Sequence, residues 1–201
     1  MRLRLDGQFD RSSFLGRTLA ASGAVALAGF AAGSGRSAAA GPSEEQNIRI
    51  LNFLLRLEYA QVALYDGGVS AGALRGELRE FAEVCGDQDR KHVDSLRAIV
   101  GDKAQAQPSF RFGDAVRNPA RFTAAALTLE ETASAAYIGQ AANLTKDRLS
   151  DIAGIVAVDA RHAAWIRAIA GRNPAPHAAD PAKTVRQVMR TLARTKFVEQ
   201  A

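Results

Sequence analysis

Apolar residues recur every three or four positions through most of the chain beyond its first forty residues. This periodicity predicts amphipathic helices, because half-buried strands would need apolar and polar residues to alternate. Four long helices are expected, at about 44–66, 73–100, 119–142 and 146–170. With one longer connection, between the second and the third helix, this order predicts an all-α four-helix bundle.

Boundary signals support these ranges. Ser43 and Gln46 have the spacing of a capping box at the start of the first helix, and Asn118 and Pro119 are suited to the N-cap and first position of the third. Glycines directly follow the second and fourth helices, where a C-terminal cap is expected.

A proline-rich break at 173–176 separates the bundle from the last part of the chain. Asp180 and Pro181 are expected to begin a short amphipathic fifth helix, whose basic residues would form a solvated face. The folded part is therefore divided into a bundle at 41–175 and a C-terminal amphipathic helix at 176–201.

Residues 1–40 have the layout of an export signal, with a basic start, an uncharged stretch at 18–35 and small residues at 38–40. The segment around Arg11 resembles a twin-arginine signal in degenerate form, because Ser12 stands where the second arginine would be. A cleaved signal predicts a protein of the periplasm or cell envelope that meets the membrane only transiently. An uncleaved membrane anchor is the alternative, although the stretch is rich in Ala and Gly.

Composition narrows the functional classes. Hydrophobic residues make up 47% of the 201 residues and charged residues 23%, as in ordinary globular proteins. The net charge is +5, but residues 1–40 hold five arginines against two aspartates, so only +2 remains beyond them. That is too little to predict a nucleic-acid surface. The single cysteine, Cys85, excludes an intramolecular disulfide and is expected to be a small buried hydrophobe.

Each half of the chain carries a Glu with a Tyr seven residues later, followed by an Asp-x-x-His motif. The residues are Glu58, Tyr65, Asp89 and His92 in the first half, and Glu130, Tyr137, Asp159 and His162 in the second. The repeat predicts two matching helical hairpins related by an approximate two-fold axis. Any site on that axis would receive the same residue types from both hairpins.

The repeated residues suit a dinuclear metal site. Residues three apart share one helix face, and neighbouring positions place both Asp-x-x-His pairs on the apolar stripe. Four carboxylates facing one core would repel each other, whereas two divalent cations would neutralise them. The expected ligands are Glu58, Asp89, His92, Glu130, Asp159 and His162, and this mixture of oxygen and nitrogen suits two iron or manganese ions. A metal-free polar network is the alternative.

Two choices within this site remain. Glu131 competes with Glu130, but the repeat and the seven-residue step to Tyr137 favour Glu130. Tyr65 and Tyr137 fall on the site face, where they would hydrogen-bond the ligands, donate single electrons or simply pack. Elsewhere, Trp165 is expected to pack between helices and His177 to be exposed.

The stretches LEET at 129–132, AYIG at 136–139 and ARHAAW at 160–165 resemble the ferritin-like proteins of the ferritin and rubrerythrin superfamily, and more narrowly their exported bacterial group. The resemblance spans about 46–171. It implies a ferritin-like bundle in which Glu58 and Glu130 are single-carboxylate ligands and the two motif histidines are imidazole ligands. Both histidine motifs begin with Asp where the family has Glu, and Asp is one methylene shorter.

Two functions follow as hypotheses. In the first, the protein holds a dinuclear centre that reacts with O₂ or peroxide, or oxidises iron. Electrons would come from outside the chain, because one cysteine cannot build a rubredoxin-like module. In the second, it is a metal-free helical bundle of the cell envelope with a structural or interaction role. The export signal and fifth helix leave room for a homodimer but argue against a 24-subunit iron store.

Overall fold

The computed structural model describes residues 41–197, which form five α-helices and no extended strand. The helices are α2 (Glu44–Ser70), α3 (Gly76–Val100), α4 (Pro119–Ala141), α5 (Lys146–Ile169) and α6 (Val185–Thr195). Two short 3₁₀ turns, η1 (Gly101–Lys103) and η2 (Gly113–Val116), lie in the connection between α3 and α4. The predicted all-α bundle with a short fifth helix is confirmed.

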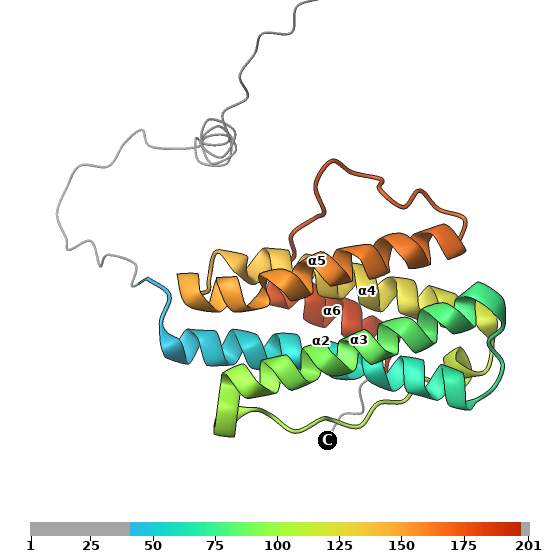
Figure 1. Ribbon diagram of the computed structural model, residues 1–201, viewed down its shortest axis with the longest axis horizontal. Helices are drawn as coiled ribbons and strands as arrows, with labels where there is room; N and C mark the ends of the chain where they lie inside the picture. Colours follow the sequence, from blue (N-terminus) through green and yellow to red (C-terminus); the bar gives the residue numbers. More distant parts are fainter. Residues whose placement is uncertain (1–40, 198–201) are drawn as a thin grey trace, which may run out of the picture. The chain divides into compact units, whose positions relative to one another are not determined.

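The four long helices form two hairpins, α2 with α3 and α4 with α5 (Figure 1). The connection between α3 and α4 runs back along the length of the bundle, so α4 begins near the end of α2 and runs antiparallel to it (Figure 1). This arrangement agrees with the two matching hairpins that the sequence repeat predicts. It brings the middle of every long helix to one central region.

The core lies between the hairpins and is built from leucines and aromatic rings. Tyr65, Phe81 and Phe122 are fully buried, and the Tyr65 ring centroid lies 5.5 Å from that of Phe81 in an edge-to-face contact. Trp165 stacks edge-on against Phe81 at 5.4 Å and donates its indole N–H to Glu77. The predicted packing of Trp165 between helices is therefore confirmed.

The first helix is longer than the sequence predicts. Glycine at position 67 indicates an end near residue 66, but α2 continues to Ser70. Both glycines lie inside the helix at close contacts: a Cβ at Gly67 would lie 2.8 Å from Val116 Cγ1, and a Cβ at Gly68 would lie 2.4 Å from the Phe122 ring. The close approach of α2 to this ring needs a glycine inside the helix, so the glycine marks packing instead of a terminus.

The start predicted for the fifth helix, at Asp180 and Pro181, is wrong. α6 begins at Val185 behind a capping box formed by Thr184 and Gln187. The residues before it are held in a non-helical conformation on α4, where the Lys183 backbone N–H donates to the Ala135 carbonyl at 2.8 Å.

Helix α6 is amphipathic, as predicted. Val188 and Leu192 are buried, whereas Arg186, Arg190 and Arg194 are exposed to solvent. Beyond the helix, the Phe197 carbonyl accepts from the Arg111 backbone N–H at 2.7 Å. The C-terminal segment therefore contacts both α4 and the connection between the hairpins.

The export signal predicted for residues 1–40 lies outside the described residues. Among the helices of residues 41–197, none is long and apolar enough to cross a membrane.

Candidate metal centre

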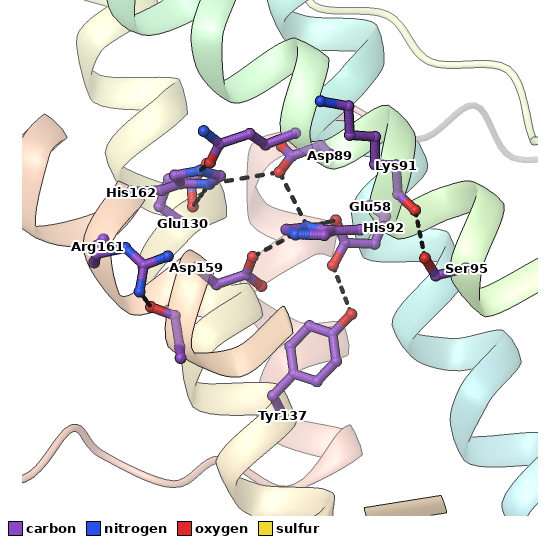
Figure 2. A network of polar contacts seen from close by, with 12 residues as sticks. Glu58, Asp89, Lys91, His92, Ser95, Glu130, Tyr137, Asp159, Arg161 and His162 are labelled. Atoms are coloured by element: carbon purple, nitrogen blue, oxygen red, sulfur yellow. Dashed lines mark hydrogen bonds and ion pairs between the residues drawn. The ribbon is translucent and has the colours of Figure 1, made fainter. Parts of the chain in front are cut away.

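Six ligand-type side chains converge in the middle of the bundle (Figure 2). Helix α2 supplies one carboxylate and α4 another, while α3 and α5 each supply an aspartate and a histidine one turn apart. The residues are Glu58, Asp89, His92, Glu130, Asp159 and His162. The four carboxylates are fully buried, and the histidines are 7% and 3% exposed.

Four of these residues surround the first of two potential metal positions. The Nδ1 atom of His92 lies 3.3 Å from Glu58 Oε2, 3.4 Å from Asp89 Oδ1 and 3.5 Å from Asp159 Oδ1. One potential ligand atom from each residue lies within 4.8 Å of the others. This group offers three carboxylates and one imidazole to a single cation.

Three residues surround the second position. The Nδ1 atom of His162 lies 3.5 Å from Asp89 Oδ1 and 3.8 Å from Glu130 Oε2. Figure 2 shows Asp89 between the two imidazoles, linked to both. Asp89 therefore belongs to both groups, and the two positions share a carboxylate.

The oxygens that face this region lack donors. Both carboxylate oxygens of Asp89 and of Asp159, Oε2 of Glu130 and Nδ1 of His162 are buried without a hydrogen-bond partner. Their separations of 3.4–3.8 Å from neighbouring site atoms exceed ordinary hydrogen-bond lengths. Unpaired buried carboxylates are costly, and divalent cations would satisfy them. The donor set consequently fits a pair of such ions.

Two tyrosines hold the glutamates from the opposite hairpin. The Tyr137 hydroxyl donates to Glu58 Oε1 at 2.6 Å, and the Tyr65 hydroxyl donates to Glu130 Oε1. Burial, and next the nearby carboxylates, raise the pKa of both phenols well above the usual value. The tyrosines therefore remain protonated donors that orient one oxygen of each glutamate and leave the other facing the site.

Burial also shifts the acids and bases of the site. It raises the pKa values of Asp89 and Asp159, and repulsion from the two glutamates adds to the shift. It raises the pKa of Glu130 to about 7, although the Tyr65 hydrogen bond opposes the change. It lowers the pKa of His162 to about 4, assisted by the charge of His92. The site thus favours neutral groups, and a cation must displace protons to bind.

Glu131 is not part of this cluster. Its side chain is partly exposed and pairs with Arg167 at 2.9 Å, whereas Glu130 is fully buried. Adjacent residues on a helix point about 100° apart, so only one of the two can face the core. The repeat-based choice of Glu130 agrees with this placement.

Sequence reasoning missed Gln88 as a site neighbour. Its side-chain oxygen lies 2.8 Å from Nε2 of His162, across the gap between α3 and α5. Gln88 stands one turn before His92, and that position was the only signal available in the sequence. Cys85 is buried, in agreement with the prediction of a small buried hydrophobe, and burial raises the pKa of its thiol. His177 is exposed in its loop, as predicted.

The comparisons with known proteins agree with this geometry. The sequence profile of the ferritin-like domain matches residues 46–172, which is well over half of the chain. The matched region contains α3, α4, α5 and nearly all of α2, with all six clustered residues. A comparison with curated proteins found no match. On the extent of the profile match, the chain belongs to the ferritin-like domain family.

Proposed function

We propose that this protein binds two divalent iron or manganese ions in the bundle core and acts in O₂ or peroxide chemistry or in the oxidation of Fe(II). The observation that carries the proposal is the set of buried carboxylate and imidazole atoms without hydrogen-bond partners, gathered in two overlapping groups. Without a cation, these buried groups either repel each other when ionised or stay protonated without hydrogen-bond partners, and both states are unfavourable in a low-dielectric interior.

Charge balance supports two ions. Glu58, His92 and Asp159 would hold one ion, Glu130 and His162 the other, and Asp89 would serve both. The four carboxylates carry four negative charges when ionised, and two divalent cations carry four positive charges. A single divalent ion would leave two buried carboxylates uncompensated.

The bound ions would supply one-electron redox chemistry to O₂ or peroxide, or Fe(II) would itself be the substrate. The chain's own residues prepare the site for this role. Tyr65 and Tyr137 fix the two glutamates, and burial of all four carboxylates keeps bulk water away. His92, the most exposed of the six at 7%, marks the side on which a small oxidant would enter.

Metal analysis tests the proposal. Protein purified with Mn(II), or with Fe(II) under anaerobic conditions, should contain about two ions per chain by elemental analysis. Replacing His92 and His162 together by Ala should remove most of the metal, whereas His177→Ala, in the exposed loop, should leave it unchanged.

Protein that retains folded structure but takes up no iron, manganese or zinc would refute the proposal. The metal-free envelope bundle would then be the better description. Metal-loaded protein that neither consumes peroxide or O₂ nor oxidises Fe(II) would remove the redox part and leave a structural metal site.

We further propose that the protein is exported and that its signal is cleaved near Ala40 and Gly41. The proposal rests on the basic start, the uncharged stretch and the small residues that precede this point. N-terminal sequencing of protein made in its native host should begin near Gly41. Membrane-bound protein that retains Met1 would contradict cleavage and support the anchor.

A further inference from the structure

Gln88 makes the two halves of the metal site unequal. It lies half-buried on α3, and its side-chain oxygen is 2.8 Å from Nε2 of His162 on α5. In the sequence repeat that aligns Asp89 with Asp159, the counterpart of Gln88 is Val158. A valine side chain offers no acceptor, so no equivalent contact can be made to His92 from that position.

The contact determines which nitrogen of His162 can bind a metal. An amide oxygen can only accept, so Nε2 carries the proton and donates to Gln88. The lone pair is then on Nδ1, the atom that is buried without a partner and faces Asp89 and Glu130. Metal-bound histidines are commonly oriented in this way by an acceptor at the other ring nitrogen.

The second position depends most on this orientation because it has fewer ligands. The first group contains Glu58, Asp89, His92 and Asp159, whereas the second contains only Asp89, Glu130 and His162. With three residues, one of them shared, a misdirected imidazole would leave two carboxylates alone to hold the ion. The first position would still keep its own imidazole and three carboxylates.

We propose that Gln88 is a positioning residue for the three-residue position, and that this position binds its ion at full affinity only when the side chain at 88 can accept a hydrogen bond from His162. The inference rests on the proposed dinuclear site. It predicts two binding events of unequal strength, of which only the weaker depends on Gln88.

Manganese titration of four proteins tests the inference. The wild type should bind two Mn(II) ions per chain in equilibrium dialysis. Gln88→Val, which introduces the residue of the other repeat, should keep one ion at unchanged affinity and bind the second about 10–100-fold more weakly. Gln88→Glu retains an acceptor and should restore the second ion. Val158→Ala, a matched change beside Asp159, should bind two ions.

A second measurement does not depend on metal. In the metal-free protein, ¹⁵N chemical shifts of the histidine rings should show His162 as the Nε2–H tautomer in the wild type and in Gln88→Glu. The Val variant should show a mixture of tautomers. If Gln88→Val does not fold, Gln88→Met keeps the side-chain length without the amide and takes its place.

The outcomes separate the two proposals. A wild type that binds no metal overturns the proposed function, and the inference falls with it. A wild type with two ions, together with a Val or Met variant that binds two ions equally well and keeps the same tautomer, overturns the role of Gln88 alone. Equal loss of both ions in the Val variant would also contradict it, because the first position should not depend on residue 88.

Discussion

Glu130→Gln should stabilise the metal-free protein at alkaline pH. Glu130 is fully buried, and its environment raises its pKa from 4.5 to about 7. Gln keeps the shape of the side chain and can still accept the Tyr65 hydrogen bond, but it cannot ionise. The substitution therefore removes the cost of a buried charge and little else.

The pKa shift sets the size and the sign of the effect. The folded protein holds the Glu130 proton more tightly than the unfolded chain does, so this contribution to stability is complete below pH 4.5 and is lost as the pH rises through 7. A shift of this size corresponds to about 3 kcal/mol. His162, whose pKa is lowered to about 4, has the opposite slope between pH 4 and 6.5. That slope is common to both proteins and largely cancels in their difference.

Urea unfolding in EDTA, at intervals from pH 4.5 to 8, measures this difference. The free energy of unfolding of Glu130→Gln, relative to the wild type, should rise by about 3 kcal/mol across the range and then level off. Glu131→Gln is the matched control for the loss of one carboxylate. It breaks the partly exposed pair with Arg167 and should cost about 1 kcal/mol or less.

Saturating Mn(II) should reverse the order of stability and make the wild type the more stable protein, because Glu130→Gln then lacks a charged ligand. A Glu130→Gln protein that is less stable than the wild type at pH 8 in EDTA would refute the reasoning about uncompensated buried carboxylates. A difference that does not change with pH would refute it equally. If manganese leaves the order unchanged, Glu130 is not a ligand.

Three further changes give distinct results. Mn(II) or Fe(II) at one hundred times its Kd should add about 2.7 kcal/mol to the free energy of unfolding of the wild type, seen as a higher Tm. Replacing His92 and His162 together by Ala should abolish most of the rise, whereas His162→Ala alone should remove only the part that comes from the second ion. The Asp89→Glu and Asp159→Glu double change restores the ligand length of the family. Calorimetric titration should show tighter metal binding if the aspartates only weaken the site. Looser metal binding would indicate a site tuned to a wider metal spacing. Gly139→Ala should lower the free energy of unfolding by about 1–3 kcal/mol and expose the C-terminal segment to proteases, because its Cβ would lie 2.0 Å from the Lys183 carbonyl oxygen. Unchanged stability would show that this segment does not rest on α4.

The bundle and the cluster were predictable because both depend on residue spacing. Helical periodicity survives in any sequence that buries one face, and the duplicated Glu and Asp-x-x-His spacings identify which residues share a face. Packing two matching hairpins against each other then places four of these residues around a common centre: Glu58, His92, Glu130 and His162. This part of the prediction needs no knowledge of individual contacts.

What the sequence could not supply were features that depend on neighbours distant in the chain. Gly67 resembles a helix terminus until Val116 is placed against it. Pro181 resembles a helix start until the Lys183 backbone is seen to pair with α4. Gln88 resembles an ordinary polar residue until α5 brings His162 beside it. In each case a tertiary contact decides between local alternatives that the sequence leaves equal.

The exchange of tyrosine contacts between the hairpins has a consequence for how the site assembles. Tyr137 of the second hairpin donates a hydrogen bond to Glu58 of the first, and Tyr65 of the first donates one to Glu130 of the second. In both cases the tyrosine that orients the glutamate belongs to the other hairpin, so these two hydrogen bonds form only when the hairpins dock.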